Sequence, residues 1–449
     1  MKKLLALTTA VLAASAAFAS GFGLYEPTAI GTSYGGALLG KGLDGSANTI
    51  NPATLDDITN ITLQVGFVTE HPRGRIKISR DGRTYKCSPM DPGFFVLPHV
   101  QLVAPALWGF TFGLGITPDY GLGTRYSHDS LMTWSSKQTT IEGFVINPNL
   151  SYRITDDWSI GAGARLLFFD FEQYSYPASY SASQVPGNAF VRNHLHGNNG
   201  FSSCGFQLGT RYKILDNLSA GIVYKSKIDT RVKGHSNFRV PRNAYVPTAA
   251  GVLPPGIYGG GASANLDIPQ SVAAGFNWDI TKDWHLGAMV SWTDWSELDK
   301  ISFKLPRVPG DKTTKLRWKD SWRVGIAPSW DFAEDWTAVV SYVYDTNVCA
   351  YDQQSTMLPP GDRQIISGGI SWRMTQNLQI DVTYGIVLMG AKARAGGCGV
   401  FAEGLPEEEP SAAADRSASH LLISAARERG DFAFHEVAEN LLSFLSPML

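Results

Sequence analysis

A strict alternation of apolar and polar residues, sustained over about ten residues at a time, is the most constraining feature of this sequence. From Leu378 to Ile386 every second residue is apolar, and the residues between them are Gln, Asp, Thr and Gly. The same alternation recurs in segments that start at Trp158, Trp284, Trp322 and Trp336. A period of two is that of a β-strand whose two faces meet different surroundings.

The positions of the arginines favour a membrane as one of those surroundings. Arg153, Arg165, Arg211, Arg323 and Arg373 all fall on the polar parity of their segments. An arginine that faces lipid at mid-membrane costs roughly 2–4 kcal/mol, whereas one in a wet lumen costs little. Period two alone would also allow a soluble β-sandwich, but Trp and Tyr cluster at the segment ends, as in an aromatic girdle. The sequence therefore predicts an all-β fold, a transmembrane antiparallel β-barrel.

The N-terminus predicts export. Lys2 and Lys3 precede the apolar stretch Leu4–Phe18, which ends in the small-x-small site Ala17-Phe18-Ala19. Residues 1–19 are thus a predicted cleaved signal peptide, and the expected location is the outer membrane. No later run of 18 apolar residues exists, which excludes helical spans. Without the two lysines, 36 positive residues stand against 40 negative ones, so nothing in the charge indicates a nucleic-acid partner.

Tight polar turns set the expected strand count. They lie at 105–108, 155–157, 215–217, 281–283, 333–335 and 375–377, and longer connections alternate with them. Short periplasmic turns and long outer loops are typical of outer-membrane barrels. With a first strand near Ile61, six such turns imply fourteen strands, of which thirteen are readable, the last being Leu378–Met389. The longest outer connections, about 171–199 and 230–267, are expected to be functional.

The two ends of the mature chain break this pattern. Residues 20–60 are rich in glycine and have no clear period, and we expect them to form a hatch inside the lumen of a barrel formed by residues 61–390. The tail, residues 391–449, has no Trp or Tyr, and Leu421–Leu445 predicts an amphipathic helix. We expect this tail to be atypical, partly helical or disordered, and not barrel-like. It is either a foreign or frame-shifted segment, or it contributes a poor fourteenth strand near Gly430–Val437.

Several short motifs resemble those of the FadL-type outer-membrane transporters of long-chain fatty acids and other hydrophobic compounds, over about residues 20–390. They are Gly21-Phe22-Gly23-Leu24, Asn51-Pro52-Ala53, Asp119-Tyr120-Gly121-Leu122, Trp292-Thr293-Asp294-Trp295-Ser296, Tyr344-Asp345 and Leu358-Pro359-Pro360-Gly361-Asp362-Arg363. The resemblance implies fourteen strands, an N-terminal hatch, ligand capture between the third and fourth outer loops, and lateral exit beside a kinked third strand. Pro118 is the candidate for that kink, since proline removes a ladder donor. The candidate gating residues of the hatch are Gly21, Phe22, Leu24, Asn51, Pro52 and Ala53.

The function predicted from these features is a passive channel for long-chain fatty acids or similar hydrophobic molecules. An aromatic-hydrocarbon channel of the same family is the alternative, and a general porin or a lipase would be alternatives of other classes. Lumen arginines can bind a carboxylate head group, which makes Arg153, Arg165, Arg211 and Arg323 candidates; they can equally pair with lumen acids such as Asp279 and Asp381. We expect a monomer in outer-membrane lipid.

Three motifs that suggest other chemistry lack their required context. Gly31–Gly35 spells the GxSxG of hydrolases without a preceding strand, and Gly35–Lys41 spells GxxxxGK without the following Ser or Thr. His194 and His196 with Cys204 match no standard zinc spacing. The four cysteines form no CxxC pair. No enzymatic activity, cofactor or metal is therefore expected.

Overall fold

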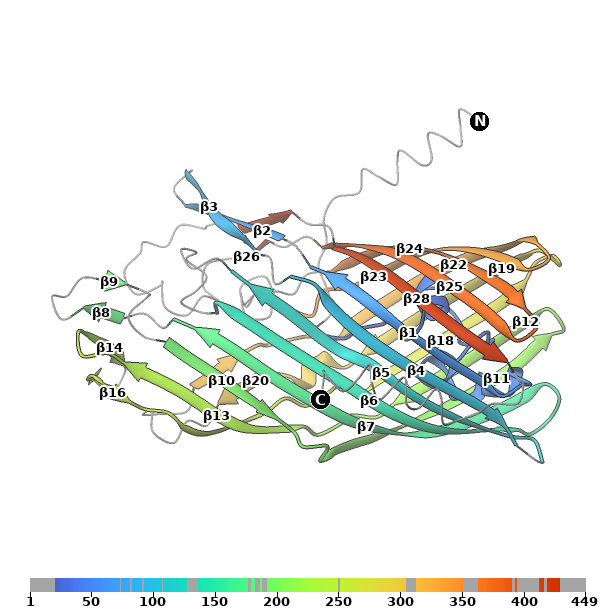
Figure 1. Ribbon diagram of the computed structural model, residues 1–449, viewed down its shortest axis with the longest axis horizontal. Helices are drawn as coiled ribbons and strands as arrows, with labels where there is room; N and C mark the ends of the chain where they lie inside the picture. The colour runs from blue at the N-terminus through green and yellow to red at the C-terminus, as the bar shows by residue number, and fades with distance from the viewer. Residues whose placement is uncertain are drawn as a thin grey trace.

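The computed structural model describes residues 21–72, 74–80, 83–90, 93–106, 108–126, 136–176, 179–181, 186–187, 192–248, 251–303, 312–349, 362–389, 392–393, 412–415 and 418–428. Within them lies one main sheet of eighteen strands. Four of these strands extend the sheet at one end, and the other fourteen pair antiparallel as the wall of a barrel (Figure 1). The predicted signal peptide lies outside the described residues.

The wall strands follow the chain in order, each paired with the next. They are β1 (Thr62–His71), β4 (Phe95–Pro105), β5 (Phe110–Arg125), β6 (Gln138–Arg153), β7 (Trp158–Ser175), β11 (Ser203–Leu215), β12 (Leu218–Lys225), β18 (Ser271–Asp279), β19 (Trp284–Thr293), β22 (Ser321–Ala333), β23 (Trp336–Asp345), β24 (Arg363–Thr375), β25 (Leu378–Met389) and β28 (Ala418–Glu428). All six predicted tight turns join consecutive wall strands, and we call that end of the barrel the turn end.

The opposite end, which we call the loop end, carries the remaining strands. The main sheet is extended there by β10 (Arg192–Asn198), β13 (Arg231–Val240), β16 (Gly256–Ile257) and β17 (Gly260–Asn265). Smaller sheets are formed by β2 (Gly74–Arg80), β3 (Arg83–Met90), β26 (Lys392–Ala393) and β27 (Ala412–Asp415), by β8 (Ser179–Ser181), β9 (Pro186–Gly187), β14 (Ala244–Thr248) and β15 (Gly251–Leu253), and by β20 (Lys300–Phe303) and β21 (Lys312–Lys315). The long predicted outer connections thus contain ordered β-structure.

The two faces of the wall differ as the alternation predicts. Along β7 the side chains of Trp158, Ile160 and Leu166 are exposed, whereas Arg165 and Leu167, on the alternate parity, are buried. The same contrast holds along β22, where Trp322, Val324 and Ile326 are exposed and Arg323 is buried. A continuous band of exposed large apolar side chains is what a lipid-facing surface requires.

The tail differs from its sequence-based expectation. Residues 418–428 form strand β28, not a helix, and β28 pairs with β25 along one edge and with β1 along the other. In lipid, unpaired backbone groups on two strand edges each cost several kcal/mol. Completing both ladders outweighs the helical pattern of this stretch, so the expectation of a tail without a barrel strand is wrong for these residues. The alternative strand at Gly430–Val437 lies outside the described residues.

Among the described residues, short helices lie within residues 21–57 and in one loop. They are α2 (Ala29–Ser33), α3 (Ala47–Ile50), the 3-10 helix η1 (Pro52–Asp57) and the 3-10 helix η3 (Trp295–Glu297). Thr28 caps α2 with its hydroxyl, and Asn51 caps η1 with its side-chain oxygen. Among the described residues no helix is long and apolar enough to cross a membrane.

Candidate hatch and ligand cavity

Residues 21–57, which we call the N-terminal segment, pack against the inner face of the wall. Helix α2 contacts β24 and β25, and η1 contacts β6, β7 and β11. Glycines on the wall permit this close approach. A Cβ at Gly221 would lie 1.8 Å from the Leu39 carbonyl oxygen, and one at Gly161 would lie 2.4 Å from the Pro52 carbonyl carbon. Figure 1 shows these short helices inside the ring of strands.

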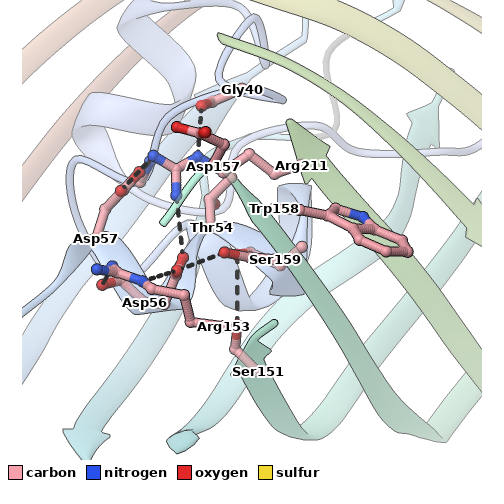
Figure 2. A network of polar contacts seen from close by, with 12 residues as sticks. Gly40, Thr54, Asp56, Asp57, Ser151, Arg153, Asp157, Trp158, Ser159 and Arg211 are labelled. Carbon is pink, nitrogen blue, oxygen red and sulfur yellow. Dashed lines mark hydrogen bonds and ion pairs between the residues drawn. The ribbon is translucent and has the colours of Figure 1, made fainter. Parts of the chain in front are cut away.

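The η1 end of the segment is held by charged groups. Arg153 Nε donates to Asp56 Oδ2 at 2.8 Å, and Arg211 Nη1 lies 3.4 Å from Asp56 Oδ1 (Figure 2). Arg211 Nη2 also lies 2.7 Å from Asp57 Oδ1. Burial raises the pKa of the Asp57 carboxyl, and the Arg211 guanidinium opposes that shift. Asp56 and Arg211 are both buried, so this network replaces water for both partners.

Asn51 adds a second attachment at the same end. Its side-chain nitrogen donates to the carbonyls of Leu39, at 2.7 Å, and Thr210, at 3.1 Å. Its side-chain oxygen accepts from the Ala53 backbone N–H at 3.1 Å. One buried amide thereby connects the segment to itself and to strand β11, which gives the Asn51-Pro52-Ala53 motif a physical role.

The opposite end of the segment pairs with the edge of β5. β5 pairs with β4 only as far as Ile116, and its ladder with β6 is irregular between Pro118 and Tyr120. Beyond that point the segment takes the place of β4. Leu24 N–H donates to the Asp119 carbonyl, and Gly121 N–H donates to the Phe22 carbonyl, both at 2.9 Å. Pro118 therefore lies where the wall loses one ladder and the N-terminal segment supplies another.

Aromatic packing and one arginine complete this Phe22 end. The Phe22 ring meets Trp295 at 5.1 Å, Phe169 at 6.0 Å and Tyr120 at 6.1 Å between centroids, each edge to face. Arg363 donates to the carbonyls of Gly23, at 2.9 Å, and Gly21, at 3.3 Å. This end is held by backbone hydrogen bonds, by aromatic rings and by the Arg363 side chain, whose Nε lies 4.0 Å from Asp345 Oδ2 on β23; Phe22, Gly23 and Leu24 contribute no charged side chain.

A cavity of about 120 Å³ lies behind this junction. Its apolar lining includes Leu24, Leu39, Val223, Met289 and Trp295, and its rim includes Pro118 and Tyr120. This volume is of the same order as that of the roughly 150 Å³ engineered cavity that takes up benzene. The cavity thus joins the N-terminal segment, the irregular part of β5 and the lumen wall.

Three cations and two carboxylates line the same cavity: Arg165, Lys225, Arg323, Glu26 and Asp119. Arg165 is matched, since its Nη2 lies 3.3 Å from Asp119 Oδ2 and 2.8 Å from the Tyr120 hydroxyl. Arg323 lies over the Tyr25 ring at 4.0 Å, and its buried Nε has no hydrogen-bond partner in the described part of the chain. The side-chain ammonium group of Lys225 makes no hydrogen bond or ion pair with the described residues.

The four arginines singled out from the sequence fall into two groups. Arg153 and Arg211 bind Asp56 and Asp57 of the segment, whereas Arg165 and Arg323 line the cavity. Asp279 and Asp381, the lumen acids named as possible partners, have other contacts: Asp279 pairs with Lys41 and His285, and Asp381 accepts a hydrogen bond from Gln379. Lys225 is a cavity residue that the arginine pattern does not reveal, although it shares the inward parity of Gly221 and Val223 in β12.

The motifs that suggested other chemistry have ordinary structural contacts. The Ser33 hydroxyl, at the GxSxG position, donates to the Ile30 carbonyl at 2.8 Å. His194 bonds Glu172 and His196 bonds Asp170. No group of three or more metal-ligating side chains occurs in the described ranges.

Comparison with known proteins identifies the family. The profile described as outer membrane protein transport protein (OMPP1/FadL/TodX) matches residues 10–395. The chain belongs to this family. It is 25% identical to the long-chain fatty acid transport protein of Salmonella typhi, over 85% of this chain and 90% of that one. Identity to the protein of the same name from Escherichia coli K12 is 24%, with the same coverage.

Solved structures agree on the fold. A Pseudomonas aeruginosa FadL homologue superposes with a TM-score of 0.75 at 19% identity, covering 91% of this chain and 100% of that one. The Pseudomonas putida toluene transporter TodX superposes with a TM-score of 0.66 at 17% identity, with the same coverage. The predicted outer-membrane β-barrel and the family resemblance are thereby confirmed.

Proposed function

We propose that this chain is a passive channel for uptake of long-chain fatty acids across the outer membrane. The observation that carries the proposal is the pair of cations, Lys225 and Arg323, in a cavity whose lining is otherwise mostly apolar. A fatty acid offers a carboxylate and an alkyl chain, which match a charged group without an ion pair and an apolar wall respectively. The long-chain fatty acid transport proteins among its relatives support the same substrate class.

The route that we propose passes from the loop end through the cavity and out through the wall. Residues 20–60 act as the hatch, with Gly21, Phe22 and Leu24 as its moving part and Asn51, Pro52 and Ala53 as its fixed part. When the strand formed by Phe22–Leu24 leaves β5, the cavity gains an opening beside Pro118, where β4 and β5 are no longer paired. Lateral exit then delivers the apolar chain directly to lipid.

Aromatic hydrocarbons are the second candidate class. The cavity volume of about 120 Å³ suits a single ring without rearrangement, and toluene transporters share the fold. A carboxylate forms an ion pair with Lys225 or Arg323, whereas a neutral ring offers only the weaker attraction of its π face, so these residues separate the two candidates.

Uptake of radiolabelled oleate and of toluene, in cells that lack their own transporter, tests the proposal. The variants are Lys225→Met and Arg323→Met, and Lys282→Met, at an exposed position of the turn end, is the control. We expect oleate uptake to fall about tenfold or more in the first two, as for a lost charged hydrogen bond, while toluene uptake is unchanged. If the unaltered chain took up toluene but not oleate, its substrates would be aromatic hydrocarbons. If it took up neither, the proposal of hydrophobic transport would be refuted.

A further inference from the structure

A row of cations covers the outer surface of β10 and β13 at the loop end of the barrel. Along β13 the exposed residues are Arg231, Lys233, His235, Asn237 and Arg239, and they alternate with Val232, Ser236, Phe238 and Val240, which are buried, and with half-buried Gly234. Arg192 is exposed on the adjacent strand β10. We call Arg192, Arg231, Lys233 and Arg239 the basic face.

Within the described part of the chain, no intramolecular partner balances these charges. Among the described residues, none of the four side chains has a hydrogen bond or an ion pair. Arg192 and Arg239 are moreover direct partners in the β10–β13 ladder, and like charges directly opposite each other destabilise a sheet. The nearest acids on the neighbouring strand β7, Asp170 and Glu172, are engaged by His196 and His194. The basic face is therefore open to an external anion.

The strand registers place Lys233 just beyond the apolar band, and Arg239, with Arg192 opposite it, lies six residues, about 20 Å, further out along β13. Lys233 pairs with Asn198, and Asn198 pairs with Asp170. Asp170 follows Phe168, whose ring lies 4.8 Å from that of Phe201 at the end of the lipid-facing side of β7. At about 3.3 Å per residue, Lys233 lies in a row only about 7 Å further along the strands than Phe168. That is the depth at which lipid head groups meet a membrane protein.

We propose that the basic face binds the phosphate groups of a phosphorylated glycolipid in the outer leaflet of the membrane. Guanidinium groups match phosphate oxygens in bidentate geometry, and an anion between Arg192 and Arg239 removes their mutual repulsion. The surface is continuous with the lipid-facing wall, so an anchored lipid reaches it with its head group while its chains remain against the apolar band. This assignment is independent of what the channel transports.

Binding of purified lipid A to the full-length protein in detergent tests the proposal. The variant is Lys233→Gln combined with Arg239→Gln, and the matched control, Lys213→Gln combined with Lys282→Gln, removes equal charge at the turn end. With each basic residue worth a factor of about five near a membrane surface, we expect affinity to fall about thirtyfold in the first variant and to stay unchanged in the control. Equal affinity of all three proteins would overturn the proposal.

Two further probes identify the ligand. Dephosphorylated lipid A should bind the unaltered protein no better than the double variant binds the phosphorylated form. Inorganic phosphate should not compete at equimolar concentration; if it does, the site is a phosphate site and the glycolipid assignment is wrong. Heat-modifiable migration and oleate uptake report folding and transport separately, because the basic face does not line the cavity. Retention of both, with loss of lipid A binding, is the result that we expect.

Discussion

At its η1 end the N-terminal segment meets the wall through buried charges, whereas at its Phe22 end it meets the wall through backbone bonds and aromatic rings. Asp56 and Asp57 engage Arg153 and Arg211 on β6 and β11. Phe22, by contrast, packs among Trp295, Phe169 and Tyr120, and its backbone continues the β5 ladder. One segment therefore carries two different kinds of attachment.

This difference indicates which end of the N-terminal segment can move. Separating a buried ion pair costs several kcal/mol when neither water nor another charge replaces the lost partner. The η1 end therefore has no alternative position of similar free energy. An apolar ring and a strand edge can be replaced by other apolar groups, including a ligand chain, at little cost. The comparison predicts a fixed end at η1 and an exchangeable end at Phe22.

The largest expected effect is on the fixed end. Asp56→Ala removes the acceptor of Arg153 Nε and Ser159 Oγ and leaves Arg153 without its ion pair. Breaking a buried pair from one side costs about 3–5 kcal/mol, and the low end of that range applies here because the Arg153 side chain is 38% exposed and Arg211 keeps its contact with Asp57. We expect the hatch to detach, which single-channel conductance in a planar bilayer would show as a rise in ion current. Asp56→Asn is the control: it keeps a hydrogen-bonding oxygen, and we expect a smaller rise in ion current. If Asp56→Ala channels stayed closed, the ion pairs of Asp56 would not be what holds the hatch in place.

The next effect concerns the exchangeable end. Phe22→Ala removes a ring that is 1% exposed, and such a truncation costs about 3 kcal/mol or more in a packed core. We expect this cost to appear as local release, seen as faster hydrogen exchange at the amides of Leu24 and Gly121. Global unfolding in denaturant should be nearly unchanged. Leu43→Ala, at an exposed position of the same segment, is the control, and a matching drop in global stability for Phe22→Ala would erase the distinction between the two ends.

The wall of this barrel was largely readable from the sequence, because its signals are local. Alternation within a strand and polar residues at a tight turn depend on neighbours in the chain, so the six turns and the strand Leu378–Met389 were predicted at the observed positions. β28 was not, since its conformation is decided by the edges of β1 and β25, which no property of residues 418–428 reveals.

The arginines that face the lumen were easier to predict than the acids with which they pair. Arg153 and Arg211 were expected to face the lumen, and they do, but their partners Asp56 and Asp57 lie about a hundred residues or more away in the chain. A sequence gives parity and charge, not which of several lumen acids comes within reach. Lys225 illustrates the opposite case: its inward parity is visible in the sequence, and a pattern that includes lysines as well as arginines identifies it.

A smaller effect is expected for the arginine that holds the carbonyls of the Phe22 end. Arg363→Met removes the donors to Gly21 and Gly23, and hydrogen bonds to charged groups contribute about 1.5–3 kcal/mol. We expect hydrogen exchange at Leu24 to accelerate less than in Phe22→Ala. Arg363→Lys should recover part of the protection, because a single ammonium can still reach one carbonyl. If hydrogen exchange at Leu24 were unaltered in Arg363→Met, this arginine would not help to hold the Phe22 end, and the remaining contacts of that end would suffice.

The smallest effect tests the backbone of the same end. Gly21 has a φ of +45°, and a Cβ there would lie 2.5 Å from the Trp295 ring. For a residue with a side chain, the left-handed conformation alone costs about 1–2 kcal/mol. Gly21→Ala should therefore loosen the segment modestly, and Trp295→Leu should remove the steric part of that cost in the double variant. The cost of the left-handed backbone conformation would remain in the double variant. A coupling energy near zero between the two substitutions would show that the Trp295 ring moves aside at no cost. Backbone conformation, and not contact with the ring, would then be the reason for glycine at position 21.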